Sequence, residues 1–302
     1  MGFQAPSIVV GVEMLMKKYS LVSNGPSAVS EDQYFDYCCM EYSKMLENQN
    51  LLERNYQSFF EHNPCMLPGA LEGNPSHGPL FWAVISQPEI GRDIIRRPDF
   101  MWITMTSLEL IPVLIEIERP DKAEFRVSDN VQNSKFTQAL EQIKEWKALL
   151  KKHDVLEAFF ERYSIPDRLA RPECVKPVFK LIYGRRKEFE NDPWLQDKRR
   201  AAQGNNFDIL SFDRLSPNRD SMSYGCIRID GKGCQYAVSV PPTFRLGPVV
   251  AGACSKWSGF PNAVRESGCK DDRKQFLISR YEYWSKWALD ANHGLYCTSD
   301  WE

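Results

Sequence analysis

The sequence predicts an α/β fold in which helices flank a central mixed sheet, and three observations support this prediction. Helical periodicity occupies residues 31–61 and 136–163. An apolar hairpin is predicted between them, over residues 100–118, and two more strand-like runs follow at residues 175–186 and 207–212. This order of helix, strands, helix and strand is typical of proteins in which helices cover a sheet.

The first predicted helix runs from Glu31 to about Glu61. It stops at His62-Asn63-Pro64, because a proline disfavours helical geometry in the residue before it. Residues 69–78 contain three glycines and a proline, and they predict a loop. The apolar residues of the helix recur at spacings of three, four or their sums: Tyr34, Tyr42, Met45, Leu51, Leu52, Tyr56, Phe59 and Phe60.

The predicted sheet begins with an apolar run at residues 80–86, and the hairpin of residues 100–104 and 110–118 follows. The second hairpin strand is apolar until Glu116 and Glu118 appear at its end. Such a strand is expected to be buried on both faces, so an acid within it needs a metal or another partner.

Two helices are predicted next, over residues 136–156 and 155–163, and the second ends before Pro166. The strand of residues 175–186 runs into a basic turn, and residues 207–212 predict a further short strand. The first of the two helices carries one apolar stripe: Phe136, Leu140, Ile143, Trp146, Leu149 and Leu150.

The chain changes character after Asp213, where polar and proline-rich stretches separate the predicted elements. A strand is expected over residues 236–240 and a final helix over residues 271–290. We therefore expect an N-terminal segment (residues 1–44), a main domain (residues 45–215) and a C-terminal α+β extension (residues 216–302). The extension would pack on the main domain or mediate oligomerisation.

The composition is that of an ordinary globular protein, with 43% hydrophobic and 26% charged residues and a net charge of -2. The net charge therefore gives no indication of nucleic-acid binding, although positive charge can be concentrated locally. The nine cysteines form no CxxC pair and the four histidines no ligand-like pair, so neither a zinc site nor a disulfide framework is expected. Without a signal peptide or an apolar membrane segment, the sequence predicts a cytoplasmic protein.

Three acids form the central constellation of the sequence: Asp99, Glu116 and Glu118. Alternate residues of a strand share a face, so Glu116 and Glu118 are expected to point to one side. Asp99 opens the other strand of the hairpin, which would bring three carboxylates together. Such a cluster repels itself unless a cation neutralises it, and oxygen ligands favour Mg²⁺ or Mn²⁺. The alternative is a set of solvated acids at a strand end.

Two further polar residues lie in the predicted helices. Gln142 interrupts the apolar stripe where the helix would pass the acids, which suits a contact to phosphate or water. Glu61 ends the first helix and could face the same cleft, whereas the simpler interpretation is a solvated acid at a helix end.

Positive charge is concentrated in three runs, at residues 91–97, 184–187 and 198–200. Two of them flank predicted strands, where arginines could hold a phosphate backbone. A single run of this kind is usually solvated surface. The side chains expected to contact nucleic acid are Arg97, Arg119, Lys144, Arg185 and Arg186.

Five short motifs follow one another along the chain: Phe59–Pro64, Arg97–Phe100, Ile115–Pro120, Ala139–Trp146 and Ile182–Arg186. Together, over roughly residues 45–215, they resemble the nuclease domain of Shedu anti-phage defence proteins, which belongs to the PD-(D/E)xK superfamily. The resemblance implies a PD-(D/E)xK nuclease-like core and a homo-oligomer. It also implies an endonuclease that nicks or cuts phage or plasmid DNA with Mg²⁺ or Mn²⁺.

The resemblance also implies roles for individual residues. Asp99 and Glu116 would be metal ligands, with the Ile117 carbonyl as a third. Gln142 would support the substrate or the attacking water, and Glu61 would be an accessory acid.

One departure from the superfamily pattern concerns Glu118, which stands where many members carry lysine. Glu118 could bind a second metal or accept a proton from water. A lysine from elsewhere, such as Lys144 or Lys135, could reach the site instead. Alternatively, catalysis is lost, and the chain is an inactive nucleic-acid-binding or scaffold protein on a nuclease fold.

Overall fold

The computed structural model describes residues 18–72, 77–290 and 294–302. Its strands form one sheet in the order β5-β4-β3-β2-β1-β6-β7-β8. The sheet is mixed, because four neighbouring pairs run parallel and three antiparallel. The strands are β1 (Ala83–Ser86), β2 (Phe100–Met105), β3 (Leu110–Ile117), β4 (Val178–Ile182), β5 (Phe207–Leu210), β6 (Gly225–Ile229), β7 (Gln235–Ser239) and β8 (Trp257–Ser258).

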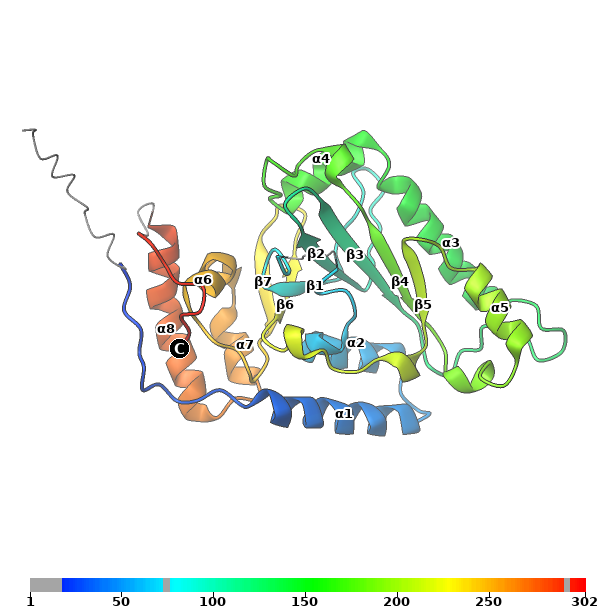
Figure 1. Cartoon of the computed structure of the whole chain (residues 1–302), viewed down its shortest axis with the longest axis horizontal. Coiled ribbons are helices and arrows are strands. Elements are labelled where there is room, and N and C mark those ends of the chain that lie inside the picture. The colour runs from blue at the N-terminus through cyan, green and yellow to red at the C-terminus, as the bar shows by residue number, and fades with distance from the viewer. Residues whose placement is uncertain (1–17, 73–76, 291–293) are drawn as a thin grey trace, which may run out of the picture.

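Helices cover both faces of the sheet, so the predicted α/β class is confirmed. Figure 1 shows α1 and α2 on one side, α3 and α4 on the other, and α6 to α8 beyond β6 and β7. Short 3-10 helices include η3 (Arg186–Glu188) and η4 (Phe212–Arg214). The helices are α1 (Glu31–Glu47), α2 (Glu53–His62), α3 (Ser134–Leu149), α4 (His153–Arg162), α5 (Pro193–Ala201), α6 (Pro248–Cys254), α7 (Phe260–Glu266) and α8 (Asp271–Leu289).

The predicted hairpin is confirmed as the antiparallel pair β2 and β3. Phe100 lies opposite Ile115, so Asp99 and Glu116 follow side by side at the same end of the hairpin. Both strands are almost wholly buried, as their apolar sequences indicate.

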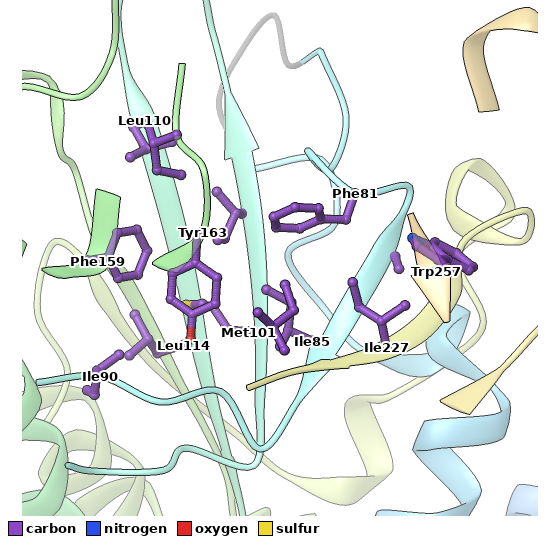
Figure 2. Packing of buried hydrophobic residues seen from close by; sticks show 14 of the residues in the cluster. Phe81, Ile85, Ile90, Met101, Leu110, Leu114, Phe159, Tyr163, Ile227 and Trp257 are labelled. Carbon is purple, nitrogen blue, oxygen red and sulfur yellow. The ribbon is translucent and has the colours of Figure 1, made fainter. Parts of the chain in front are cut away.

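Two apolar cores lie on the two faces of the sheet. Met101 and Leu114 belong to the core that α3 and α4 cover, part of which Figure 2 shows. Phe100 and Ile115 belong to the core beneath α1 and α2. Because side chains alternate along a strand, Glu116 shares the α3 face with Leu114.

The prediction of a single helix over residues 31–61 is wrong, since α1 ends at Glu47 and α2 begins at Glu53. The Asn48 side chain accepts a hydrogen bond from the Asn50 amide (3.0 Å), and the Asn55 side chain accepts one from Leu52 (2.9 Å). Asparagine competes with helical hydrogen bonding in this way, and it favours turns.

The prediction of two helices between residues 136 and 163 is confirmed, although the first ends at Leu149 and not at residue 156. The strand expected from Leu80 starts only at Ala83, because residues 79–82 form a turn in which Trp82 has φ 55°. The loop predicted over residues 69–78 includes residues 73–76, which lie outside the described residues.

Several elements were not predicted, among them α5 and β6. The signal for α5 was present, because Asp192 caps the helix by accepting from the Trp194 and Leu195 amides (3.0 and 3.1 Å) and Pro193 is its first residue. β6 pairs in parallel with β1, so the sheet continues across the boundary expected at residue 215. In the described part of the chain, no helix is long and apolar enough to cross a membrane.

Candidate active site

Asp99 and Glu116 meet at the end of the hairpin. Asp99 directly precedes β2, and its Oδ2 accepts a hydrogen bond from the Ile117 amide at 2.7 Å. This contact clamps the two strand ends together, and it leaves Oδ1 of Asp99 available for another ligand.

Glu116 points toward α3, where Gln142 Nε2 donates a hydrogen bond to Glu116 Oε1 at 2.7 Å. The other oxygen, Oε2, is buried and has no hydrogen-bond partner among the described residues. A buried carboxylate oxygen without a partner is costly. This atom therefore indicates a position for a proton or a cation.

Both acids are perturbed by their surroundings. Burial raises the pKa of Asp99 to about 7, against the lowering effect of the Ile117 amide. Burial, followed by the charges of Asp99 and Glu118, raises the pKa of Glu116 well above its usual range. Perturbed carboxyls of this kind are typical of functional sites, although structural networks also produce them.

Glu118 lies close enough to Asp99 and Glu116 for its charge to raise the pKa of both, but its side chain also has a partner of its own. The Glu118 side chain forms an ion pair with Lys122, which lies four residues further along the chain. Lys122 Nζ also lies 3.7 Å from Glu53 Oε2 at the start of α2. Across the residues that the structure describes, no group of three or more His, Cys, Asp or Glu side chains could hold a metal ion.

The remaining donors still fit Mg²⁺, which proteins usually bind through one or two carboxylates with several water molecules. Asp99 and Glu116 supply two carboxylates, and one of these carries the unpartnered oxygen. The Ile117 carbonyl, predicted as a third ligand, belongs to the residue between Glu116 and Glu118. Gln142 fixes the orientation of the Glu116 carboxylate, as the outer contacts of metal ligands commonly do.

The lysine nearest to Glu118 is Lys122, which the sequence analysis missed. Lys144 lies on an exposed surface of α3 and pairs with Glu141 at 2.6 Å, while Lys135 is exposed near the start of that helix. Only the spacing of four residues between Glu118 and Lys122 could have indicated the contact.

We expect Lys122→Met to lower the rate of any DNA cleavage by roughly 10- to 100-fold, the range for loss of a group that supports the residues of a metal site from outside. The methionine retains the stem of the lysine but removes the positive charge beside Glu118 and Glu53. Single-turnover nicking rates measured across pH 6 to 9 would test this, with Lys232→Met on the exposed β6–β7 turn as the control. Equal rates and pH profiles in both variants would remove Lys122 from the site.

Glu61 lies on the opposite face of the sheet, so the expectation that it faces the same cleft is wrong. Its carboxylate accepts from Ser86 Oγ at 2.5 Å and pairs with Arg228 at 3.0 Å. The acid of α2 nearest to the site is Glu53, whose charge raises the pKa of Asp99 after the larger effect of burial. Glu53 and Glu61 differ in position because the first residue of α2 lies near the end of the hairpin, whereas its last turn packs against β1 and β6.

Tyr183 is a further residue that the sequence analysis missed. It follows β4 directly, and its ring packs edge-on against Phe136 of α3 at 5.0 Å. Its hydroxyl is buried and has no hydrogen-bond partner among the described residues. Burial raises the pKa of this phenol, and Glu118 is the largest electrostatic contributor. Tyr183 therefore lies on the α3 face near the acids.

The arginines predicted to contact nucleic acid differ in their surroundings. Arg97 pairs with Glu89 at 2.6 Å, and Arg119 forms a two-pronged contact to Asp121 (2.8 and 2.6 Å). Arg185 is held by Asp213 at 2.7 Å, whereas Arg186 is exposed. Arg185 and Arg186 follow the carboxyl end of β4, at the same sheet edge as Glu116.

Comparison with known proteins connects this site to one family. The family model described as "Shedu protein SduA, C-terminal" matches residues 50–216. The match covers more than half of the chain and includes Asp99, Glu116 and Gln142. Among curated proteins, none matches the chain.

Proposed function

The chain belongs to the Shedu family, which implies a role in anti-phage defence, and we propose that it acts there as a metal-dependent DNA endonuclease of the PD-(D/E)xK type. One observation supports this proposal above the others. Two half-buried carboxylates, those of Asp99 and Glu116, lie at the ends of adjacent strands beside an amide donor, and the buried Oε2 of Glu116 has no hydrogen-bond partner among the described residues.

In this proposal Asp99, Glu116 and the Ile117 carbonyl hold Mg²⁺ or Mn²⁺. A bound divalent ion would polarise the scissile phosphate, lower the pKa of the attacking water and stabilise the charge that develops. Gln142 keeps the Glu116 carboxylate in one orientation. The Ile117 amide does the same for Asp99.

Glu118 and Lys122 act together in the proposed reaction. Lys122 supplies positive charge next to the position at which many superfamily members carry lysine, so Glu118 at that position does not leave the site without a cation. Glu118 is then a candidate proton acceptor for the attacking water. Both roles depend on geometry that forms only when DNA is bound.

The second candidate is a DNA-binding or scaffold protein that does not cut. The observation that favours it is the pairing of Glu118 with Lys122, which occupies the carboxylate that would otherwise accept a proton from water. Under this alternative, DNA binding would not depend on the metal, and it would survive Glu116→Ala unchanged.

A plasmid-nicking assay distinguishes the two candidates. With Mg²⁺ or Mn²⁺ the wild type is expected to nick supercoiled plasmid, and chelator is expected to stop it. Asp99→Ala removes both a ligand and the clamp on Ile117, so we expect at least a 100-fold loss, comparable to the loss of other groups that stabilise a transition state. Glu173→Gln, an exposed acid outside the site, is the control.

The endonuclease proposal would be abandoned if wild type and Asp99→Ala nicked equally, or if no DNA were cut with either metal. The same preparations can test the proposed homo-oligomer by light scattering after size exclusion. A monomeric mass would contradict that part of the proposal.

A further inference from the structure

A polar pocket of about 690 Å³ opens between η3, α5 and η4. Four arginines line it, Arg186, Arg199, Arg200 and Arg214, with side-chain amides among the other residues. The one acid in its lining is Glu190. Side chains from three separate elements thus concentrate positive charge in a protein whose net charge is negative.

Arg199 is held firmly in the wall of this pocket. Its Nε donates to both oxygens of the fully buried Glu124, at 2.8 and 3.0 Å, and its guanidinium lies 4.6 Å from the centre of the Phe189 ring. One terminal nitrogen, NH2, is buried without a hydrogen-bond partner among the described residues. A buried guanidinium nitrogen without an acceptor is costly, and it indicates that an acceptor is missing.

The other arginines are available to a ligand. In the described part of the chain neither Arg186 nor Arg214 forms an ion pair, and Arg200 pairs only with Asp197 in an exposed contact of little energetic weight. Four guanidinium groups, one of them firmly positioned, match the geometry of phosphate groups, which arginine binds with two parallel hydrogen bonds.

The pocket lies on the same edge of the sheet as Asp99 and Glu116. The strands β3, β4 and β5 are parallel, so their carboxyl ends meet at one edge. Glu116 lies at the end of β3, whereas Arg186 and Arg214 follow β4 and β5. The distance from β3 to β5 is two strand spacings, or about 10 Å.

A groove with further cations lies beside this edge. Lys122, Arg185 and Lys187 line it, with Asp121 and Glu188 as its acids. Lys122 of this groove contacts Glu118, and Lys187 adjoins Arg186 in the chain, so the groove has one of its cations beside the acids and another next to the arginine pocket.

We propose that the arginine pocket binds backbone phosphates of the DNA strand close to the phosphate that is cut. This inference rests on the proposed function. One strand of B-DNA carries a phosphate at every nucleotide, so a strand that crosses the edge places the phosphates nearest to the cut one over the pocket. The open, polar pocket suits a sequence-independent backbone contact.

The test compares two double variants of the full chain. Arg186→Gln/Arg214→Gln removes two unpaired cations of the pocket. Arg168→Gln/Arg171→Gln removes two arginines near the β2–β3 turn, at the opposite sheet edge, where Arg168 donates to Ser107 O. Binding of a 20-base-pair duplex is measured by fluorescence anisotropy in chelator between 50 and 300 mM salt, and plasmid nicking is measured in parallel.

We expect the pocket variant to bind at least 10-fold more weakly, and the slope of log affinity against log salt to fall by about two, one for each lost phosphate contact. The opposite-edge variant should behave like the wild type. Arg186→Lys/Arg214→Lys keeps the charge but loses the two-pronged contact, so its affinity should lie between the two. Matching melting temperatures will show that the variants are folded.

Three results would overturn the proposal. If the wild type nicks plasmid but both double variants bind alike, the pocket is not a DNA contact, although the endonuclease proposal survives. If inorganic phosphate or ADP raises the melting temperature of the wild type but not of the pocket variant, while DNA binding is unchanged, the pocket serves a free phosphate compound. A wild type that neither binds nor nicks DNA would contradict the endonuclease proposal and the pocket proposal together.

Discussion

Replacing Glu116 by glutamine is expected to abolish metal-dependent nicking while the metal-free protein becomes more stable. The substitution preserves the shape of the side chain but removes a buried carboxylate whose pKa burial and Asp99 raise. An ionised acid in this position destabilises the fold unless a cation compensates it, so the amide is favourable when no metal is bound. Without the carboxylate, Asp99 alone cannot retain the ion.

Cleavage and stability must be measured on the same preparations. We expect nicking to fall by at least about 1000-fold, the upper range for a single electrostatic group. The melting temperature in chelator at pH 8 should rise by a few degrees, which corresponds to about 1 kcal/mol for a protein of this size. Gln142→Glu, which places a third acid next to Glu116, should have the opposite effect on stability. A Glu116→Gln protein that nicks normally would exclude Glu116 as a ligand.

The second large effect concerns pH and metal together. The pKa of Asp99 is about 7 in the folded protein and lower in the unfolded chain, so the folded state binds more protons between about pH 4 and pH 7. Stability in chelator should therefore fall as the pH rises through this window and level off above it. The pKa of Glu124, which burial also raises to about 7, adds to the same trend.

A divalent ion reverses this trend, because it binds the ionised carboxylates and displaces their protons. We expect Mn²⁺ or Mg²⁺ to raise the melting temperature clearly at pH 8 and hardly at pH 5.5. Scanning fluorimetry in chelator and in metal at four pH values provides the measurement. Calorimetry in two buffers of different ionisation heat should detect proton release on binding.

Asp99→Asn/Glu116→Gln is the control for this prediction. Its melting temperature should no longer respond to metal, and its dependence on pH should be reduced to the part that Glu124 contributes. A metal response that is equal at pH 5.5 and pH 8 would show that the two carboxyls do not bind the ion.

Much of the candidate site follows from local sequence patterns. The hairpin was predictable because two apolar strands lie close together in the chain, and a period of two residues then places Asp99 and Glu116 side by side. Gln142 was predictable for a similar reason, since it interrupts the apolar stripe of α3 at the position that contacts Glu116. The roles of Asp99, Glu116 and Gln142 in metal binding and cleavage are still predictions.

Other parts of the site depend on contacts that no local pattern encodes. Glu61 and Gln142 were both candidate site residues on predicted helices, yet they lie on opposite faces of the sheet. Periodicity shows which side of a helix is buried, but it does not show which face of the sheet the helix covers. In the same way, β6 begins with a glycine and contains an arginine, so its sequence alone is a weak strand signal, and pairing with the distant β1 stabilises it.

The α/β class, the hairpin and the adjacency of Asp99 and Glu116 follow from local sequence, because each depends on residues close in the chain or on a regular period. Packing between distant segments holds Arg199 against Glu124 and brings arginines from three elements into one pocket. Such contacts depend on how the carboxyl ends of β3, β4 and β5 meet at one edge of the sheet. That arrangement is formed by pairing between strands far apart in the sequence, where burial of the whole sheet outweighs local preference.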